Sequence, residues 1–130
     1  RTSIKLLKDE IVELPSGIQV IGRDDRFNKD RQSLDTLLSR TDISRPIIVL
    51  DHQPYNLAEI DASGVDLQIS GHTHNGQLWP LNLLVNEMYE QGHGYRKWSH
   101  THIYVSSGLS LWGPPFRIGT DSDMLVMTIR

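Results

Sequence analysis

Short apolar runs separated by polar turns follow one another along the chain and predict alternating strands and helices. Ile11–Leu14 and Ile18–Ile21 flank the turn residues Pro15–Gly17, a pattern that predicts a β-hairpin. Ahead of this hairpin, Ile4–Lys8 reads as the last turn of a helix. The chain therefore opens with a predicted helix end followed by two paired strands.

The middle of the chain predicts a strand–helix–strand unit. The leucines within Asp30–Leu38 recur at i, i+3 and i+4, which predicts a helix. Pro46–Leu50 is a continuous apolar, β-branched run of the kind found in strands covered on both faces. A short helix over Asn56–Ala62 and a strand over Asp66–Ile69 follow. This order predicts two parallel strands lying side by side.

The last third continues the same alternation. Leu81–Met88 predicts one or two helical turns, and the Gly- and Pro-rich stretch 106–119 predicts a long ordered loop. Three further strands are expected over Tyr95–Trp98, Thr101–Val105 and Met124–Ile129. Together the patterns predict an α/β (α+β) fold with a mixed sheet and flanking helices, as one domain over residues 1–130.

Composition narrows the function classes. The net charge of −3 argues against a nucleic-acid partner, which normally meets a basic face. The absence of cysteine excludes disulfides and thiolate zinc sites. No apolar run approaches the roughly 20 residues of a membrane helix, so we expect this chain to be soluble.

Three histidines mark the candidate site. His52 follows one of the two predicted parallel strands, and His72 and His74 follow the other. Carboxyl ends of neighbouring parallel strands meet at one edge of a sheet, so the three imidazoles are expected to converge. Neutral imidazole is the commonest metal ligand, which predicts a metal site. The alternative is a polar turn in which each histidine is only hydrogen-bonded.

Other polar residues have simpler explanations. Asp24 and Asp25 could offer carboxylate ligands, although their loop position favours a cap or an Asx turn. Arg117, in a rigid Pro-Pro loop, could lie beside a phosphate or equally pair with a carboxylate. His93 fits a loop, and His100 and His102 fit a strand face. We interpret the three tryptophans as packing residues: Trp79, Trp98 and Trp112.

Two sequence motifs, one around His52 and one around His72 and His74, resemble motifs of a known protein family. Val49-Leu50-Asp51-His52-Gln53-Pro54 followed by Gly71-His72-Thr73-His74 resembles the calcineurin-like metallophosphoesterase family. Gln77, the segment Tyr104–Leu109 and the pair Pro115 and Arg117 are similar to its bacterial, often membrane-attached branch. Asn75 stands where this branch more often has glycine, and asparagine tolerates left-handed backbone conformations.

The resemblance implies a hydrolase that cleaves phosphate esters through water activated at a dinuclear metal centre of Mn, Fe, Zn or Ni. It implies that His52 and His72 bind one metal and His74 the other. Arg117 and Asn75 are expected to contact the phosphate-ester substrate. The resemblance, and no other feature of the sequence, implies that the parent protein is attached to a membrane.

Three motif blocks of that family are absent from this sequence: Asp-x-His, Gly-Asp-x-x-Asp and Gly-Asn-His followed by an acid. The chain is therefore expected to be the C-terminal part of a metallophosphoesterase domain, half of a four-layer αββα sandwich. Its partner would be the missing N-terminal half. Alone it is expected to bind at most one ion, to be inactive, and to dimerise through exposed surfaces. The alternative is a non-catalytic metal- or protein-binding module that retains the sheet.

Overall fold

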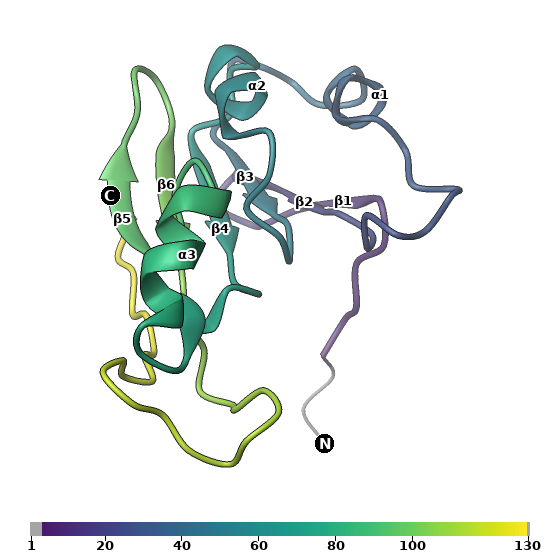
Figure 1. The fold of residues 1–130 in the computed structure, drawn as a ribbon. Coiled ribbons are helices and arrows are strands. Elements are labelled where there is room, and N and C mark those ends of the chain that lie inside the picture. Colours follow the sequence, from purple (N-terminus) through teal and green to yellow (C-terminus); the bar gives the residue numbers. More distant parts are fainter. Residues whose placement is uncertain (1–3, 130) are drawn as a thin grey trace.

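A computed structural model describes residues 4–129, which form a six-stranded mixed sheet with flanking helices (Figure 1). The strands are β1 (Glu10–Glu13), β2 (Gln19–Gly22), β3 (Ile47–Leu50), β4 (Leu67–Ser70), β5 (Gly94–Lys97) and β6 (His102–Val105). The helices are α1 (Leu34–Leu38), α2 (Leu57–Ala62) and α3 (Leu81–Met88), with a 3₁₀ turn η1 (His74–Gly76). The predicted α/β class with a mixed sheet is confirmed.

The strand order across the sheet is β1-β2-β3-β4-β6-β5. Four central strands, β2, β3, β4 and β6, run parallel, and each edge strand is antiparallel to its neighbour. The predicted hairpin forms β1 and β2, and its turn uses the positive φ of 86° at Gly17. The predicted parallel neighbours are β3 and β4, with Ile48 opposite Leu67.

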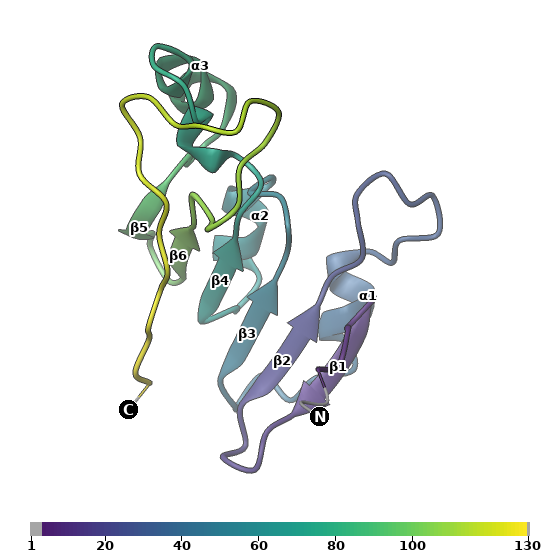
Figure 2. The same ribbon diagram turned by 90° about the horizontal axis from the view of Figure 1, so that it is seen from below.

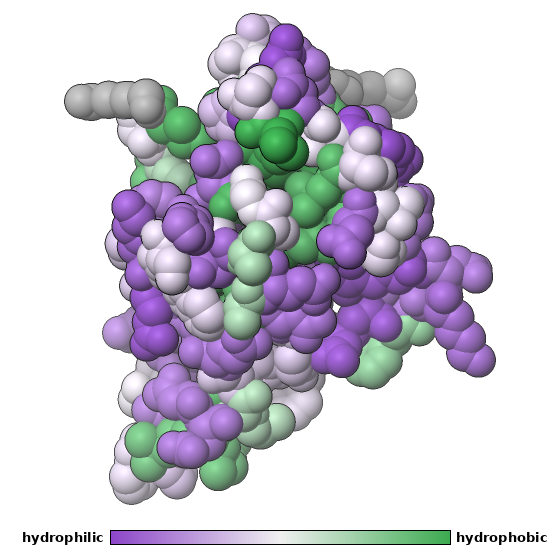
Figure 3. Space-filling model, turned by 90° about the horizontal axis from the view of Figure 1, so that it is seen from above, coloured by the Kyte–Doolittle hydropathy of each residue, from purple (hydrophilic) through white to green (hydrophobic). Residues whose placement is uncertain are grey.

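The main core lies between the sheet and the helices α1 and α2, which cover the same face (Figure 2). Alternate residues of β3 point into this core, and Ile47 and Val49 are fully buried. The cluster consists of Ile21, Leu34, Leu37, Ile47, Val49, Ile60 and Val65. A second cluster joins α2 to β6 through Leu57, Ile103 and Val105, with Trp98 packed against it. Viewed from the side of α1 and α2, the surface is mostly hydrophilic (Figure 3).

Within residues 4–129, no helix lies over the opposite face of the sheet, which is crossed by segments near the two ends of the chain (Figure 2). Near the N-terminus, Leu7 packs so tightly on Gly22 that a Cβ there would lie 2.1 Å from the leucine Cβ. Near the C-terminus, residues 127–129 lie over Ile48 and Leu67 and leave a cavity of about 430 Å³. These two segments cover the second face only in part.

Both terminal predictions of regular structure are wrong. Ile4–Lys8 is not helical, because it runs over the open sheet face with Leu7 against Gly22. Met124–Ile129 forms no strand, because it lies across the face of the sheet, where no neighbouring strand offers hydrogen bonds. The predicted helix Asp30–Leu38 is shortened to α1, since the Ser33 side chain caps its start by accepting the Thr36 N–H.

The tryptophan prediction holds for one residue of three. Trp98 packs against the second core cluster, whereas Trp79 is 64% exposed and Trp112 is 70% exposed. Both exposed rings belong to segments around the long loop 106–119, which folds as predicted without helix or strand. Among residues 4–129, no helix combines the length and the apolar character that crossing a membrane requires.

Candidate metal site

His52 and His72 meet at the carboxyl edge of the sheet. Backbone pairing continues past the ends of β3 and β4, because Asp51 donates to the Ile69 carbonyl at 3.1 Å and Gly71 donates to the His52 carbonyl at 3.0 Å. These bonds bring the imidazoles together, with His72 Nδ1 3.2 Å from His52 Nε2 and the rings nearly perpendicular. The predicted convergence of these two histidines is confirmed.

The turn that carries His72 and His74 adopts an unusual backbone conformation. His72, His74 and Asn75 have φ values of 70°, 50° and 49°, all in the left-handed region. Non-glycine residues adopt such angles at an energetic cost, and residues of this kind are enriched at functional sites. Gly76 allows α3 to pack directly on this turn, since a Cβ there would lie 2.3 Å from the Asn82 nitrogen. The packing of α3 therefore holds the strained turn in place.

Thr73 ties the same turn to the segment after α3. Its buried hydroxyl donates to the Gly92 carbonyl at 2.7 Å and accepts a hydrogen bond from the Asn75 N–H at 3.3 Å. The turn is thus fixed from both sides, by Thr73 and by the α3 backbone at Gly76.

His74 is held by the long loop. Its carbonyl accepts from Arg117 Nη1 at 2.9 Å. Its ring Nδ1 is buried without a hydrogen-bond partner among residues 4–129. No hydrogen bond or ring contact joins His74 to His52 or His72 within the same residues. The structure thus brings two of the three histidines into contact and leaves a buried nitrogen on the third.

The electrostatic surroundings favour neutral imidazoles. Burial lowers the pKa of His72, and the nearby charges of His52 and His74 lower it further against an opposing effect of Asp25. Burial also lowers the pKa of His74, with a further contribution from the charge of Arg117 and against the opposing effect of a backbone hydrogen bond at Ser110. The neutral form is the one that coordinates metals.

Arg117 and Gln77 fasten the loop 106–119 to the histidine turn. Besides the His74 carbonyl, Arg117 donates through Nη2 to the carbonyls of Ser107, Gly108 and Ser110. Gln77, only 2% exposed, donates from Nε2 to the Trp112 and Pro114 carbonyls and accepts the Trp112 N–H. Both amino groups of Arg117 are therefore committed to backbone carbonyls, which favours a positioning role, while its contact with a substrate stays a prediction.

The remaining polar candidates behave as structural residues. Asp25 accepts the Phe27 N–H at 2.8 Å, the Asx turn that its position predicts. Asp24 accepts from the side chain of Asn28. His93 and His102 have local partners, a carboxylate of Asp123 at 3.3 Å and the Tyr95 hydroxyl at 2.7 Å respectively.

A divalent metal fits this donor set only in part. The facing nitrogens of His52 and His72 are suitable ligands for two positions around one ion. Among residues 4–129, however, no three His, Asp or Glu side chains are gathered as a metal-binding group. A complete coordination shell therefore needs either a movement of His74 or ligands from outside these residues.

Sequence patterns did not single out the aromatic residues beside the histidines. The Tyr89 ring lies 6.4 Å from the His72 ring and 5.0 Å from that of Tyr55. The sequence position of Tyr55, three residues after His52, could have indicated that it lies near the site. Tyr89 gave no such signal, because it lies in a region whose hydrophobic pattern is ambiguous. Glu90, next to Tyr89, accepts the N–H groups of Leu57 and Ala58 and so caps α2.

Comparison with known proteins identifies relatives over nearly the whole chain. An uncharacterized metallophosphoesterase of Helicobacter pylori (strain J99) is 38% identical, covering 95% of this chain and 35% of that protein. One from Campylobacter jejuni is 34% identical, covering 99% of this chain and 36% of that protein. A transmembrane protein with metallophosphoesterase domain from Danio rerio is 38% identical, over 65% of this chain and 20% of that protein.

The chain thus spans about a third of the length of the Helicobacter and Campylobacter relatives. No family model matches the chain, and no solved structure does.

Proposed function

The chain belongs to the metallophosphoesterase family, and from this premise we propose that it supplies His52, His72 and His74 as metal ligands of a phosphoesterase. The observation that carries the proposal is the 3.2 Å approach of the His52 and His72 ring nitrogens at the carboxyl edge of β3 and β4. Ligand sites of open α/β sheets lie at that edge.

The chain's own residues would hold and orient the site. His52 and His72 would share one divalent ion, and His74, whose buried Nδ1 has no hydrogen-bond partner within residues 4–129, would bind a second. Bound divalent metals supply Lewis-acid activation of water and stabilise the charge on phosphoryl oxygens. Asn75 would face the phosphate-ester substrate from the turn, and Arg117 would lie beside the substrate in the long loop, where it fixes the His74 carbonyl.

We further propose that the chain is one part of a larger phosphoesterase domain. The relatives are longer, and in the described part of the chain one face of the sheet is covered by helices while the other is crossed by irregular segments near the chain ends. A second half packed on that face would complete an αββα sandwich and contribute the acidic ligands. The chain alone would then bind at most one ion and would be inactive, because imidazoles alone do not offset the repulsion of two close cations.

Membrane attachment of the parent protein is proposed on narrower support. Relatives from Danio rerio and Bos taurus are named transmembrane proteins with a metallophosphoesterase domain.

The competing possibility, a metal- or protein-binding module without catalysis, predicts zinc binding without turnover even after the rest of the domain is supplied.

Zinc titration of the chain tests the proposal. We expect His72→Ala to weaken Zn²⁺ binding at least about tenfold in calorimetry, because one of two facing imidazole ligands is lost. In the same preparations, Mn²⁺, Ni²⁺ and Zn²⁺ are each expected to give negligible turnover of a chromogenic phosphodiester.

His100→Ala is the matched control, since it removes an exposed imidazole that lies between β5 and β6. Equal zinc affinity of the His72→Ala and His100→Ala variants would contradict the ligand assignment. Turnover by the chain alone, at a rate typical of complete enzymes, would contradict the proposed division of the domain.

A further inference from the structure

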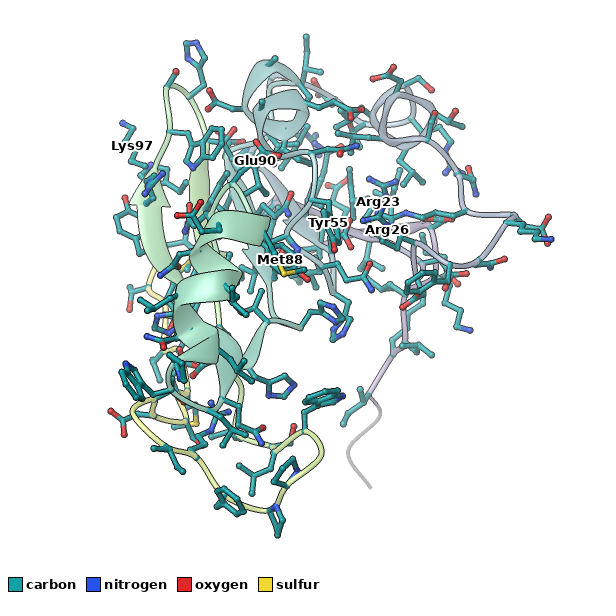
Figure 4. The ribbon with its side chains drawn as sticks, viewed as in Figure 1. Arg23, Arg26, Tyr55, Met88, Glu90 and Lys97 are labelled. Atoms are coloured by element: carbon teal, nitrogen blue, oxygen red, sulfur yellow. The ribbon has the colours of Figure 1, made fainter. Side chains whose placement is uncertain are left out.

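A polar cavity of about 360 Å³ lies at the carboxyl edge of the sheet, and its lining includes Asp51 and Gln53, the two sequence neighbours of His52. It is formed by the segments that follow β2 and β3 and by the start of α2. Three guanidinium groups line it, from Arg23, Arg26 and Arg31, together with the ring of Tyr55. Figure 4 shows Arg23, Arg26 and Tyr55 gathered in one region of the molecule.

Two acidic residues also line the cavity, and each accepts a hydrogen bond from a neighbouring side chain. Asp51 pairs with Arg31, and Glu59 accepts from the side-chain amide of Asn56 at 3.2 Å. Behind the cavity, the two oxygens of Asp9 accept the backbone N–H groups of Asp24 and Gln32. Two of the three arginines therefore pair with a carboxylate, Arg31 with Asp51 and Arg23 with Asp9, whereas Arg26 pairs with none among the described residues.

Arg23 is the most constrained of the cations. Its side chain is 10% exposed, and its buried Nε has no hydrogen-bond partner among residues 4–129, with the nearest carboxylate oxygen 3.8 Å away on Asp9. Burial, with a smaller effect of the Arg31 charge, lowers the pKa of Arg23, although the nearby carboxylates of Asp51, Asp9 and Glu59 partly oppose this. An anion bound in the cavity beside Arg23 would offset that repulsion.

Arg26 has no ion pair among the described residues, and its guanidinium carbon lies 3.9 Å above the Tyr55 ring. From Tyr55 the contacts continue to Tyr89 at 5.0 Å and from Tyr89 to His72 at 6.4 Å between ring centroids. The arginine cavity and the histidine pair are thus joined by one row of aromatic side chains.

We propose that this cavity binds a phosphate group carried on an organic substrate, at a distance from the phosphoryl group that reacts. The proposal rests on the proposed function, since the reacting group would lie at His52 and His72. The guanidinium groups of Arg23 and Arg26 would provide charge-assisted hydrogen bonds to phosphate, and the Tyr55 ring offers apolar area to the attached organic group. The substrate class is accordingly a phosphate ester with a second phosphate group.

Calorimetry of the chain in EDTA, with phenyl phosphate as the probe, tests the cavity without any metal. Arg26→Ala is expected to weaken phenyl phosphate binding at least about tenfold, the equivalent of one charge-assisted contact. Arg96→Ala is the matched control, because it removes an exposed arginine from the distant edge strand β5. His72→Ala is expected to leave this affinity within about twofold, since the probe binds without metal.

The outcomes separate the two proposals. Loss of phosphate binding in Arg26→Ala alone supports the cavity even if zinc binding fails, and an unchanged affinity in that variant overturns it. An equal loss in Arg96→Ala also overturns it, because the effect would then follow net charge. Inorganic phosphate is the second probe: tighter binding of phenyl phosphate supports a group carried on a substrate, and equal or weaker binding overturns that assignment.

Discussion

Asn75 shows how a single residue sets the geometry of the histidine turn. Its φ of 49° and ψ of 39° lie in the left-handed region, between His74 and Gly76, which also have positive φ. Asparagine and glycine reach this region at low cost, whereas a β-branched residue does not. His72 and His74 also have left-handed backbone angles, which cost conformational energy. Asn75 and Gly76 adopt such angles more easily and therefore limit the total strain energy of the turn.

We predict that Asn75→Val destabilises the chain by about 1–2 kcal/mol, because the branched side chain opposes a left-handed backbone. Asn75→Gly is expected to leave stability within about 1 kcal/mol of the parent. Urea unfolding followed by circular dichroism measures both. Asn86→Val is the control, since Asn86 is an exposed position within α3. If Asn75→Val and Asn86→Val unfolded at the same urea concentration, backbone strain would not be the cause.

At the scale of elements, the long loop 106–119 has no regular structure and yet is held by many hydrogen bonds. The buried side-chain amide of Gln77 forms the pair of hydrogen bonds that a neighbouring strand would otherwise provide, because it donates to the Trp112 carbonyl and accepts the Trp112 N–H. An isolated bridge between Leu78 and Ile118 extends the same contact. The tail beyond the loop is fixed by Asp123: burial raises the pKa of this carboxyl, but hydrogen bonds from Ser106 and Tyr104 lower it overall.

We predict that Gln77→Ala costs about 1–3 kcal/mol of stability and releases the loop, because three backbone groups lose their partner. Limited proteolysis should show new cleavage between residues 109 and 117. Leu109→Ala is the control on the same loop, since that side chain is 69% exposed. Unchanged protection of the loop in Gln77→Ala would show that other contacts hold it.

For the whole molecule, the two faces of the sheet differ in how they are covered. One face packs on α1 and α2, while the other presents residues such as Ile48, Leu50 and Leu67 beneath the crossing chain ends. Apolar sheet surface of this kind favours association with another surface. In the parent protein the proposed second half of the domain would occupy this face.

We therefore predict that the isolated chain associates with itself as concentration rises, as measured by light scattering. Leu50→Lys should reduce this association, because it places a charge on the open face, where Leu50 is 39% exposed. Phe27→Lys is the control, since Phe27 is 82% exposed in a loop away from that face. A monomer at every concentration, or an equal effect of both substitutions, would contradict this prediction.

The amino-acid sequence alone determined most elements of the sheet and the meeting of two histidines. Apolar runs such as Pro46–Leu50 and Asp66–Ile69 are local patterns, and the short helix between them leaves a parallel pairing as the natural arrangement. Once β3 and β4 are neighbours, the residues that follow them must share an edge, which is why His52 and His72 could be placed together in advance.

Only the tertiary structure determined the conformation and the contacts of the chain ends and of the long loop. Leu7 and the segment 127–129 carry apolar residues that local patterns read as helix or strand, yet the uncovered sheet face binds them as irregular chain. The arginine cavity, the Tyr55–Tyr89 contact and the Arg117 hydrogen bonds join residues far apart in sequence. Such contacts depend on packing across the whole fold, so no local pattern contains them.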